Sequence, residues 1–315
     1  MTVVDGADVP LSALRPLKKI GDGGQGEVST LDGQPHVLYK SYREPHLVNG
    51  DALSGLVSVR LALGPAERDQ LDASAAWPLC RVVDEGRVTG FLMNEAPASM
   101  SWSTADGSTR LTEMAFLLRP AKAAWQGVIQ PTPAERYGLL VALAELVDRL
   151  HATGLVVGDL SQANVLWTVR PAPAVHLLDC DGIRLSGSAP VLAQADTPDW
   201  NDPLAPPGTV TVDSDRYKAA LAIGRILAQD AYVAPGRPLV PLPGVLDDRR
   251  EAAVRALYDA AAGAYGTRPG LGQWRVALAG RAQVRLTAGQ PRPRPALDPS
   301  KFEGPRSRGT IRLRD

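Results

Sequence analysis

Hydrophobic and polar residues alternate along residues 17–93, and glycines interrupt the pattern. Alternation with a period of two is typical of strands that are buried on one face. The strands predicted in this way are residues 28–31, 36–40 and 90–93. Asp32 and Gly33 form a turn signal between the first two strands. The first third of the chain therefore predicts a small sheet that includes a hairpin.

Helical patterns, with hydrophobic residues every three to four positions, lie between the second and third of these strands and in much of the chain after residue 93. One helical stretch covers residues 51–75 and should break at residues 64–65, a Gly-Pro pair. A longer helix should begin at the capping box of residues 132–135 and stop near Gly154. Further predicted elements are a small hairpin within residues 165–178 and a helix at residues 213–229.

The chain thus divides into a sheet-rich part and a mainly helical part. The predicted boundaries are an N-terminal extension at residues 1–16, a sheet-rich unit at 17–96, a helical unit at 97–286 and a tail at 287–315. The tail is rich in proline and arginine and lacks hydrophobic periodicity, so it should form an extended basic arm.

Composition and charge narrow the class of protein. The 315 residues are 44% hydrophobic and 22% charged, and 34 basic residues balance 34 acidic ones, as in an ordinary globular chain. This balance gives no reason to expect nucleic-acid or membrane partners. Cys80 and Cys180 lie in no metal-binding pattern, and the N-terminus lacks the features of a secretory signal. We therefore expect a cytoplasmic protein.

A glycine-rich segment precedes the first predicted strand. Gly21, Gly23 and Gly26 have GxGxxG spacing, which lets backbone amides approach phosphate groups, although a plain glycine-rich hairpin has the same pattern. A dinucleotide fingerprint would need a helix after the glycines, whereas a strand follows here. Lys40 ends the next strand, where its ammonium group can pair with the α and β phosphates of a nucleotide.

Asp159 and Asn164 lie five residues apart, directly after the helix that should stop near Gly154. That spacing is typical of ATP-dependent phosphotransferases, in which the aspartate orients a hydroxyl group and the asparagine holds magnesium. Asp179 and Asp181 follow the second strand of the small hairpin. Aspartate and asparagine are common in loops, so the interpretation depends on all these motifs occurring in order.

Taken in order, the motifs resemble those of the eukaryotic-like serine/threonine protein kinases of bacteria, over roughly residues 17–280. The resemblance implies a bilobal α+β fold with a small β-rich N-lobe and a larger, mainly helical C-lobe. It also implies transfer of the γ-phosphoryl group from Mg-ATP to Ser or Thr hydroxyls of a protein substrate. By this resemblance the nucleotide contacts Gly21, Gly23, Gly24, Gly26, Val28, Lys40, Met93 and Glu95.

The resemblance also assigns roles to the acidic residues. Asp159 would act with Lys40 in catalysis, and Asn164 would bind magnesium. Asp179 stands where the family has its metal-binding aspartate, but Cys-Asp replaces the usual Phe-Gly after it, and Asp181 begins a second, shorter match. Both aspartates are predicted metal ligands. Asp179 is favoured because it follows the strand directly.

The resemblance also assigns structural roles to two residues of the helical part. Asp215 stands where the family has an aspartate that accepts hydrogen bonds from the backbone of this loop. Arg268 is similar to a late kinase arginine that pairs with the glutamate of an Ala-Pro-Glu motif. Residues 202–204 and 205–207 both lack that glutamate, which leaves this ion pair in doubt.

Departures from the family pattern keep two alternatives open. Val157 and Gly158 replace the usual His-Arg, so control by a phosphorylated residue that pairs with the arginine should be absent. Gly-Asp before a metal-binding asparagine also resembles aminoglycoside-type small-molecule kinases. No glutamate for Lys40 is evident, with Glu67 only a weak candidate, and a lysine without a partner would favour a nucleotide-binding pseudokinase scaffold.

Hydroxyl side chains give further expectations about regulation. Ser186, Ser188 and Thr197 are candidate phosphorylation sites between the aspartates and residue 203, although serine and threonine are common in any loop. Thr310, in the basic tail, is a candidate autophosphorylation site that a phosphothreonine-binding partner would recognise.

Overall fold

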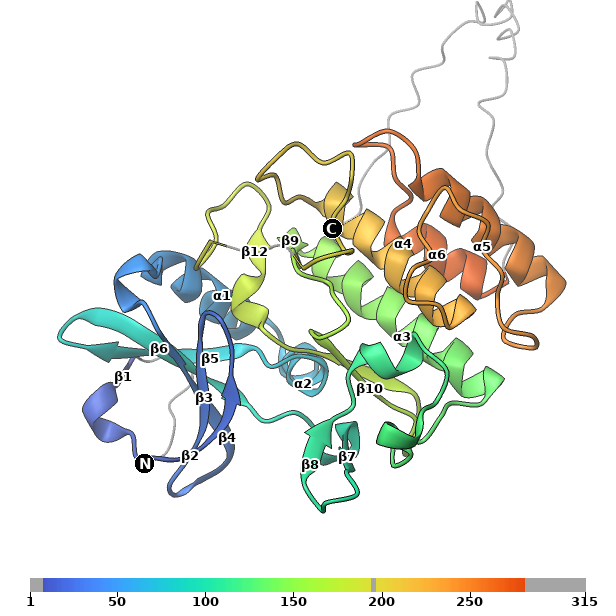
Figure 1. The fold of residues 1–315 in the computed structure, drawn as a ribbon. Coiled ribbons are helices and arrows are strands. Elements are labelled where there is room, and N and C mark those ends of the chain that lie inside the picture. Colours follow the sequence, from blue (N-terminus) through green and yellow to red (C-terminus); the bar gives the residue numbers. More distant parts are fainter. Residues whose placement is uncertain (1–7, 194–196, 281–315) are drawn as a thin grey trace, which may run out of the picture. The chain divides into compact units, whose positions relative to one another are not determined.

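A six-stranded sheet is built from the N-terminal third of the chain (Figure 1). The computed structural model describes residues 8–193 and 197–280, so the predicted tail and Thr310 lie outside the described residues. The strands are β1 (Val9–Pro10), β2 (Pro16–Asp22), β3 (Gly26–Leu31), β4 (Gln34–Tyr42), β5 (Pro78–Asp84) and β6 (Arg87–Asn94). They run in the order β1-β5-β6-β4-β3-β2, and neighbours are antiparallel except β1 and β5.

The predicted strands and the turn at residues 32–33 are confirmed as β3, β4, their connection and part of β6. Strand β1 lies within the segment that the sequence assigned to an N-terminal extension, so part of that segment belongs to the sheet. Its backbone pairs with Val82 and Val83 on β5.

The two faces of β4 differ because successive side chains of a strand point to opposite sides. Leu38 and Tyr42 belong to the main hydrophobic core, whereas Tyr39 belongs to a smaller cluster with Leu92 on β6. Lys40 lies between Leu38 and Tyr42 on the strand and therefore faces the main core. Lys40 is only 4% exposed, and a buried ammonium group needs a charged partner.

Helices α1 (Gly50–Ala62) and α2 (Pro65–Ser74) confirm the helical stretch and its break at the Gly-Pro pair. Asn49 caps α1, since its side-chain oxygen accepts a hydrogen bond of 3.0 Å from the Ala52 amide. The indole of Trp77, next to β5, donates a hydrogen bond of 2.9 Å to the Leu56 carbonyl. This contact ties α1 to the start of β5.

The rest of the described chain is mainly helical, which confirms the α+β class. Its helices are α3 (Pro133–Ala152), α4 (Val212–Ala228), α5 (Asp248–Ala261) and α6 (Leu271–Leu278). The predicted capping box is present: the Glu135 amide donates to the Thr132 hydroxyl at 3.3 Å, and the Thr132 amide donates to the Glu135 carboxylate at 2.8 Å. Helix α3 packs against α4 and α6 (Figure 1), and α5 also packs against both.

Helix α4 is buried along nearly its whole length. Gly224 lies where the helix meets Tyr258 of α5, and a Cβ atom there would be 2.3 Å from the tyrosine ring. The absence of a side chain thus allows the close approach of the two helices. One hydrophobic core extends from Leu38 on the sheet to Leu278 on α6.

Short elements connect the sheet to the helices. The predicted hairpin is confirmed as β10 (Val165–Thr168) paired with β11 (Ala174–Leu177). The other short strands are β7 (Ser101–Ser103) with β8 (Thr109–Leu111), and β9 (Leu155–Val156) with β12 (Arg184–Leu185). The 3-10 helices are η1 (Leu11–Ala13), η2 (Pro45–Leu47), η3 (Ala98–Met100), η4 (Met114–Leu117), η5 (Ala123–Trp125) and η6 (Cys180–Gly182). Among the described residues no helix has the length and apolar character needed to cross a membrane.

Candidate functional site

Asp159 lies in the loop between β9 and β10, where its partly buried carboxylate has two side-chain partners. The Asn164 amide group donates a hydrogen bond of 2.7 Å to Oδ2 and lies 3.1 Å from the Asp159 carbonyl. The Thr197 hydroxyl lies 2.9 and 3.1 Å from the two carboxylate oxygens. The structure therefore brings Asp159 and Asn164 together, as their spacing predicts.

Thr197 was expected only as a phosphorylation candidate, and its contact with Asp159 was missed. A phosphate group on Thr197 would place negative charge beside the Asp159 carboxylate, which is an unfavourable arrangement. The sequence carried no signal for this contact, because the two residues are 38 positions apart and only tertiary packing brings them together.

Asp215 on α4 fixes the backbone on the N-terminal side of Asp159. Its fully buried carboxylate accepts hydrogen bonds from the amides of Val157 at 2.6 Å and Gly158 at 2.8 Å, which confirms the predicted supporting contact. The His151 ring nitrogen Nε2 lies 3.1 Å from the same carboxylate. Gly158 has a φ of 79°, in the left-handed region that favours glycine, so the local backbone accounts for glycine at this position.

Lys218, one turn further along α4, holds the other side of the same loop. Its buried ammonium group donates a hydrogen bond of 2.7 Å to the Gly158 carbonyl. Helix α4 therefore contacts both the amide and the carbonyl of Gly158, directly before Asp159. Nothing in the sequence around Lys218 indicates this contact, because Gly158 lies 60 positions earlier in the chain.

We expect Lys218→Met to lower the free energy of unfolding by about 1–3 kcal/mol, because the buried Gly158 carbonyl loses its charged donor. Urea unfolding followed by circular dichroism measures the change. Lys18→Met is a matched control, since Lys18 is exposed and should change stability by less than about 0.5 kcal/mol. Equal stability of the two variants would contradict the Lys218 contact.

Lys40 on β4 has two aspartate partners. Its Nζ lies 2.7 Å from Oδ1 of Asp181 and 3.4 Å from Oδ1 of Asp179. The Tyr42 hydroxyl donates a hydrogen bond of 3.1 Å to Oδ2 of Asp181. Burial by itself lowers the pKa of Lys40, but the two carboxylates outweigh it and the pKa is raised, so the ammonium group stays charged.

The family pattern places the partner of Lys40, a glutamate, on the first helix after β4. Glu67, the weak candidate, is exposed and instead caps α2, where its carboxylate accepts a hydrogen bond of 3.2 Å from the Gly64 amide. The signal that could have found the true partners was the Asp-Cys-Asp sequence itself. It places two carboxylates directly after a buried strand.

A continuous series of contacts links Lys40 to Asp159. Asp179 contacts Lys40, and the preceding residue, Leu178, donates its amide hydrogen to the Asn164 carbonyl at 2.9 Å. Asn164 in turn contacts Asp159. The structure therefore brings the two residues predicted to be catalytic and the three predicted metal ligands into one region.

The carboxylate and amide groups of this region suit magnesium. Asp179 has a side chain that is 61% exposed, and its ion pair with Lys40 is long, at 3.4 Å. The NH2 end of the Asn164 amide faces Asp159, which leaves its oxygen Oδ1 for another partner. Within the described residues no group of three or more His, Cys, Asp or Glu could hold a metal alone. Magnesium commonly uses one or two carboxylates with substrate phosphates, which fits this donor set.

The glycine-rich segment connects β2 and β3. The Gly23 amide donates a hydrogen bond of 2.9 Å to the Gly26 carbonyl and closes the turn. A Cβ atom on Gly26 would lie 2.2 Å from the Ser41 carbonyl, so this glycine permits the close pairing of β3 and β4. A Cβ atom on Gly24 would meet nothing within 4 Å. Packing therefore explains Gly26, whereas at Gly24 the space beside the backbone is free for a ligand.

The tip of this segment contacts the chain before Thr197. Gln25 donates a side-chain hydrogen bond of 3.1 Å to the Ala193 carbonyl. Arg43 donates through Nε to the Gly23 carbonyl at 3.0 Å and pairs with Asp22. These contacts hold the glycine-rich tip against Arg43 and against Ala193, which precedes Thr197 in the chain.

Other predicted nucleotide contacts lie on or beside the same sheet as Lys40. Val28 on β3 is the cross-strand partner of Lys40, and Met93 on β6 pairs with Leu38. The amide of Glu95, which follows β6, already donates a hydrogen bond of 2.8 Å to the His36 carbonyl. Contacts of these residues with a nucleotide therefore remain a prediction.

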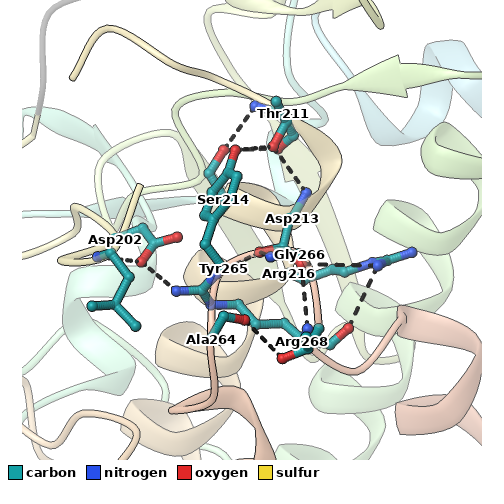
Figure 2. Close-up of polar contacts among 11 residues, drawn as sticks. Asp202, Thr211, Asp213, Ser214, Arg216, Ala264, Tyr265, Gly266 and Arg268 are labelled. Atoms are coloured by element: carbon teal, nitrogen blue, oxygen red, sulfur yellow. Dashed lines mark hydrogen bonds and ion pairs between the residues drawn. The ribbon is translucent and has the colours of Figure 1, made fainter. Parts of the chain in front are cut away.

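A second polar cluster lies at the start of α4, where Figure 2 shows Arg268 between Asp202 and Asp213. Nη2 of Arg268 lies 2.6 Å from Oδ1 of Asp202, and both side chains are almost fully buried. Nη1 pairs with Asp213. The ion pair that was in doubt is thus present, with Asp202 in the role expected of a glutamate.

Two cavities lie away from this site. One, of about 260 Å³, is lined mainly by α1, α2 and the end of α3. The other, of about 380 Å³, is lined by residues around Pro120 and Pro131 and by Leu242. Glu67, the weak candidate for the partner of Lys40, lines the first cavity, and the residues predicted to bind nucleotide or metal line neither.

Comparison with known proteins does not assign a family. No model of a protein family matches the chain, and no curated protein matches it. Any functional conclusion must therefore come from the residues and their geometry.

Proposed function

We propose that this protein is a divergent ATP-dependent kinase with a bilobal, protein-kinase-like fold, which transfers the γ-phosphoryl group of Mg-ATP to Ser or Thr hydroxyls of proteins. The observation that carries the proposal is the series of contacts from Lys40 through Asp179 and Asn164 to Asp159. Phosphoryl transfer needs a cation for the phosphates, oxygen ligands for magnesium and a carboxylate for the acceptor hydroxyl. Residues far apart in the sequence supply all three in adjacent positions.

Each residue has a role that follows from its surroundings. Lys40 stays charged and binds nucleotide phosphates. Asp179 and Asn164 would hold magnesium, which neutralises phosphate charge when it is bound. Asp159 accepts the hydroxyl of the substrate, and its contact with the Thr197 hydroxyl is an example of the hydrogen bond that a substrate Ser or Thr would make. A substrate must therefore displace Thr197 or share the carboxylate with it.

The contact of Thr197 with both oxygens of Asp159 also favours a second candidate, a nucleotide-binding pseudokinase scaffold, in which this hydroxyl keeps acceptors away. A third class, the small-molecule kinase resembling aminoglycoside phosphotransferases, remains open through the Gly158-Asp159 pair. The three classes differ in what receives the phosphate.

The test uses the full chain with γ-labelled ATP and magnesium, offered generic protein acceptors and an aminoglycoside panel in parallel. Label on serine or threonine of protein supports the proposal. Label only on small molecules would instead assign the protein to the small-molecule kinases. Binding of a fluorescent ATP analogue without any transfer would replace it by the scaffold, and absence of nucleotide binding would refute all three.

A further inference from the structure

Asp181 is the most enclosed carboxylate of the site. Oδ1 contacts Lys40 at 2.7 Å, Oδ2 accepts the hydrogen bond of Tyr42 at 3.1 Å, and the side chain is only 2% exposed. Magnesium loses its bound water molecules reluctantly and usually keeps several of them when a protein binds it. A carboxylate whose two oxygens already have protein partners, away from solvent, is poorly suited to that ion.

Asp179, two residues earlier, has the opposite surroundings. Its side chain is 61% exposed, and the contact with Lys40 is the longer of the two, at 3.4 Å. Its backbone adopts a left-handed conformation, with φ of 51°, directly after the strand β11. Asp179 can therefore accept a hydrated cation, whereas Asp181 cannot do so without giving up a partner.

The helices beside the sheet do not supply a carboxylate to Lys40. Helix α1 has one acidic residue, Asp51, which is exposed in its first turn. On α2, Glu67 caps the helix, and Asp72 accepts two hydrogen bonds from Arg60, at 2.7 and 2.6 Å. Within the part of the chain that the structure describes, the ion pairs of Lys40 go only to Asp179 and Asp181.

We propose that Asp181 is the positioning residue of Lys40, in place of a carboxylate from a helix, and that Asp179 is the aspartate that binds magnesium. The proposal deepens the nucleotide site put forward above and rests on it. It divides the two aspartates, both predicted as metal ligands from the sequence, between two different tasks.

One consequence concerns how the site is held. Asp179 and Asp181 flank the buried Cys180, and the turn is closed by hydrogen bonds from Gly182 to the Asp179 carbonyl at 2.9 Å and from Ile183 to the Cys180 carbonyl at 3.1 Å. The anchor of the lysine and the metal ligand therefore move together with η6. A shift of α1 would leave the ion pair of Lys40 intact, whereas a shift of η6 would displace both groups.

Steady-state kinetics of two aspartate variants test the division of roles. We expect Asp181→Asn to raise the KM for ATP and to lower kcat, each by about 10-fold, with less than about 2-fold change in the magnesium concentration for half-maximal rate. Asp179→Asn should raise that magnesium concentration by at least about 10-fold. Glu67→Gln, the matched control on α2, should change none of these values by more than about 2-fold.

Two kinetic outcomes would overturn the proposal. One is an Asp181→Asn variant with the magnesium requirement of Asp179→Asn. The other is a Glu67→Gln variant with a raised KM and an Asp181→Asn variant without one.

The proposal can fail independently of catalysis. If no variant shows turnover, affinity for a fluorescent ATP analogue is measured with EDTA and then with magnesium. Asp181→Asn should weaken metal-free binding by at least about 10-fold, because Lys40 loses its anchor, whereas Asp179→Asn should weaken only the magnesium-dependent binding. Equal metal-free affinity of wild type and Asp181→Asn would reject the role of Asp181 even though the kinase proposal had already failed.

Folding provides a second measurement, because Asp181→Asn leaves a buried ammonium group without its main partner. If Lys40 and Asp181 are partners, the double variant Lys40→Met with Asp181→Asn should unfold at a higher temperature than Asp181→Asn alone. A double variant that is no more stable would show that the charge of Lys40 is compensated elsewhere and would reject the proposal.

Discussion

Replacement of Asp159 by asparagine is expected to lower kcat for phosphoryl transfer by about 10²–10⁴-fold while leaving the affinity for ATP almost unchanged. The amide has nearly the shape of the carboxylate, but it carries no charge and is a poor acceptor for the hydroxyl proton. The loop should keep its conformation, because Asp215 and Lys218 hold the backbone before residue 159. The loss should therefore appear in kcat and not in nucleotide binding.

The measurement is the initial rate of label transfer from γ-labelled ATP, together with binding of a fluorescent ATP analogue. Asp69→Asn, at an exposed position on α2, is the matched control and should retain activity within about 2-fold. Equal rates for wild type and Asp159→Asn would remove Asp159 from the reaction. A variant that also lost ATP binding would indicate a structural role in the nucleotide site.

The contacts around Asp159 connect this prediction to the rest of the molecule. The loop is held from α4 by Asp215 and Lys218, and the carboxylate itself contacts Thr197 and Asn164. A rigid helix that contacts the loop backbone keeps a reactive group in place at little entropic cost during each turnover. Accuracy of position is what this arrangement can contribute to phosphoryl transfer.

The sequence predicted those parts of the fold that depend on local pattern. Alternation located β3 and β4, and the capping box located the start of α3. These elements were accessible because neighbouring residues determine them. Strands β7 and β8 are only three residues long each, too short for a periodicity to be recognised.

The parts of the site that the sequence missed depend on tertiary contacts. Lys40 and Asp181 are 141 positions apart. The Asp-Cys-Asp sequence places carboxylates after a buried strand, but no local pattern shows that one of them pairs with Lys40. The contact of Asp202 with Arg268 was not predicted for a related reason. A glutamate was expected as the partner of the arginine, and the aspartate at position 202 takes its place. Resemblance identifies the position of a missing residue, but only packing shows which other side chain takes its place.

Removal of the Arg268 side chain is expected to cause the largest loss of stability. Its guanidinium group lies between Asp202 and Asp213, whose side chains are 1% and 9% exposed (Figure 2). The rings of Tyr217 and Tyr265 lie 5.3 and 5.4 Å from its central carbon. Arg268→Ala leaves two buried carboxylates without their cation, which should lower the free energy of unfolding by about 3–5 kcal/mol.

Urea unfolding at neutral pH measures the effect, with Arg216→Ala, on the same turn of α4 as Asp213, as the control. Arg216 is one-third exposed and lies 4.0 Å from Asp213, so its loss should cost no more than about 1 kcal/mol. Burial raises the pKa of Asp202 although Arg268 opposes the shift, and without the arginine this pKa should rise further. A carboxyl group whose pKa is higher in the folded than in the unfolded state favours folding when it is protonated. The loss of unfolding free energy caused by Arg268→Ala should therefore become smaller as the pH falls toward the pKa of Asp202. A loss that is independent of pH, or no larger than that of Arg216→Ala, would contradict the buried charge cluster.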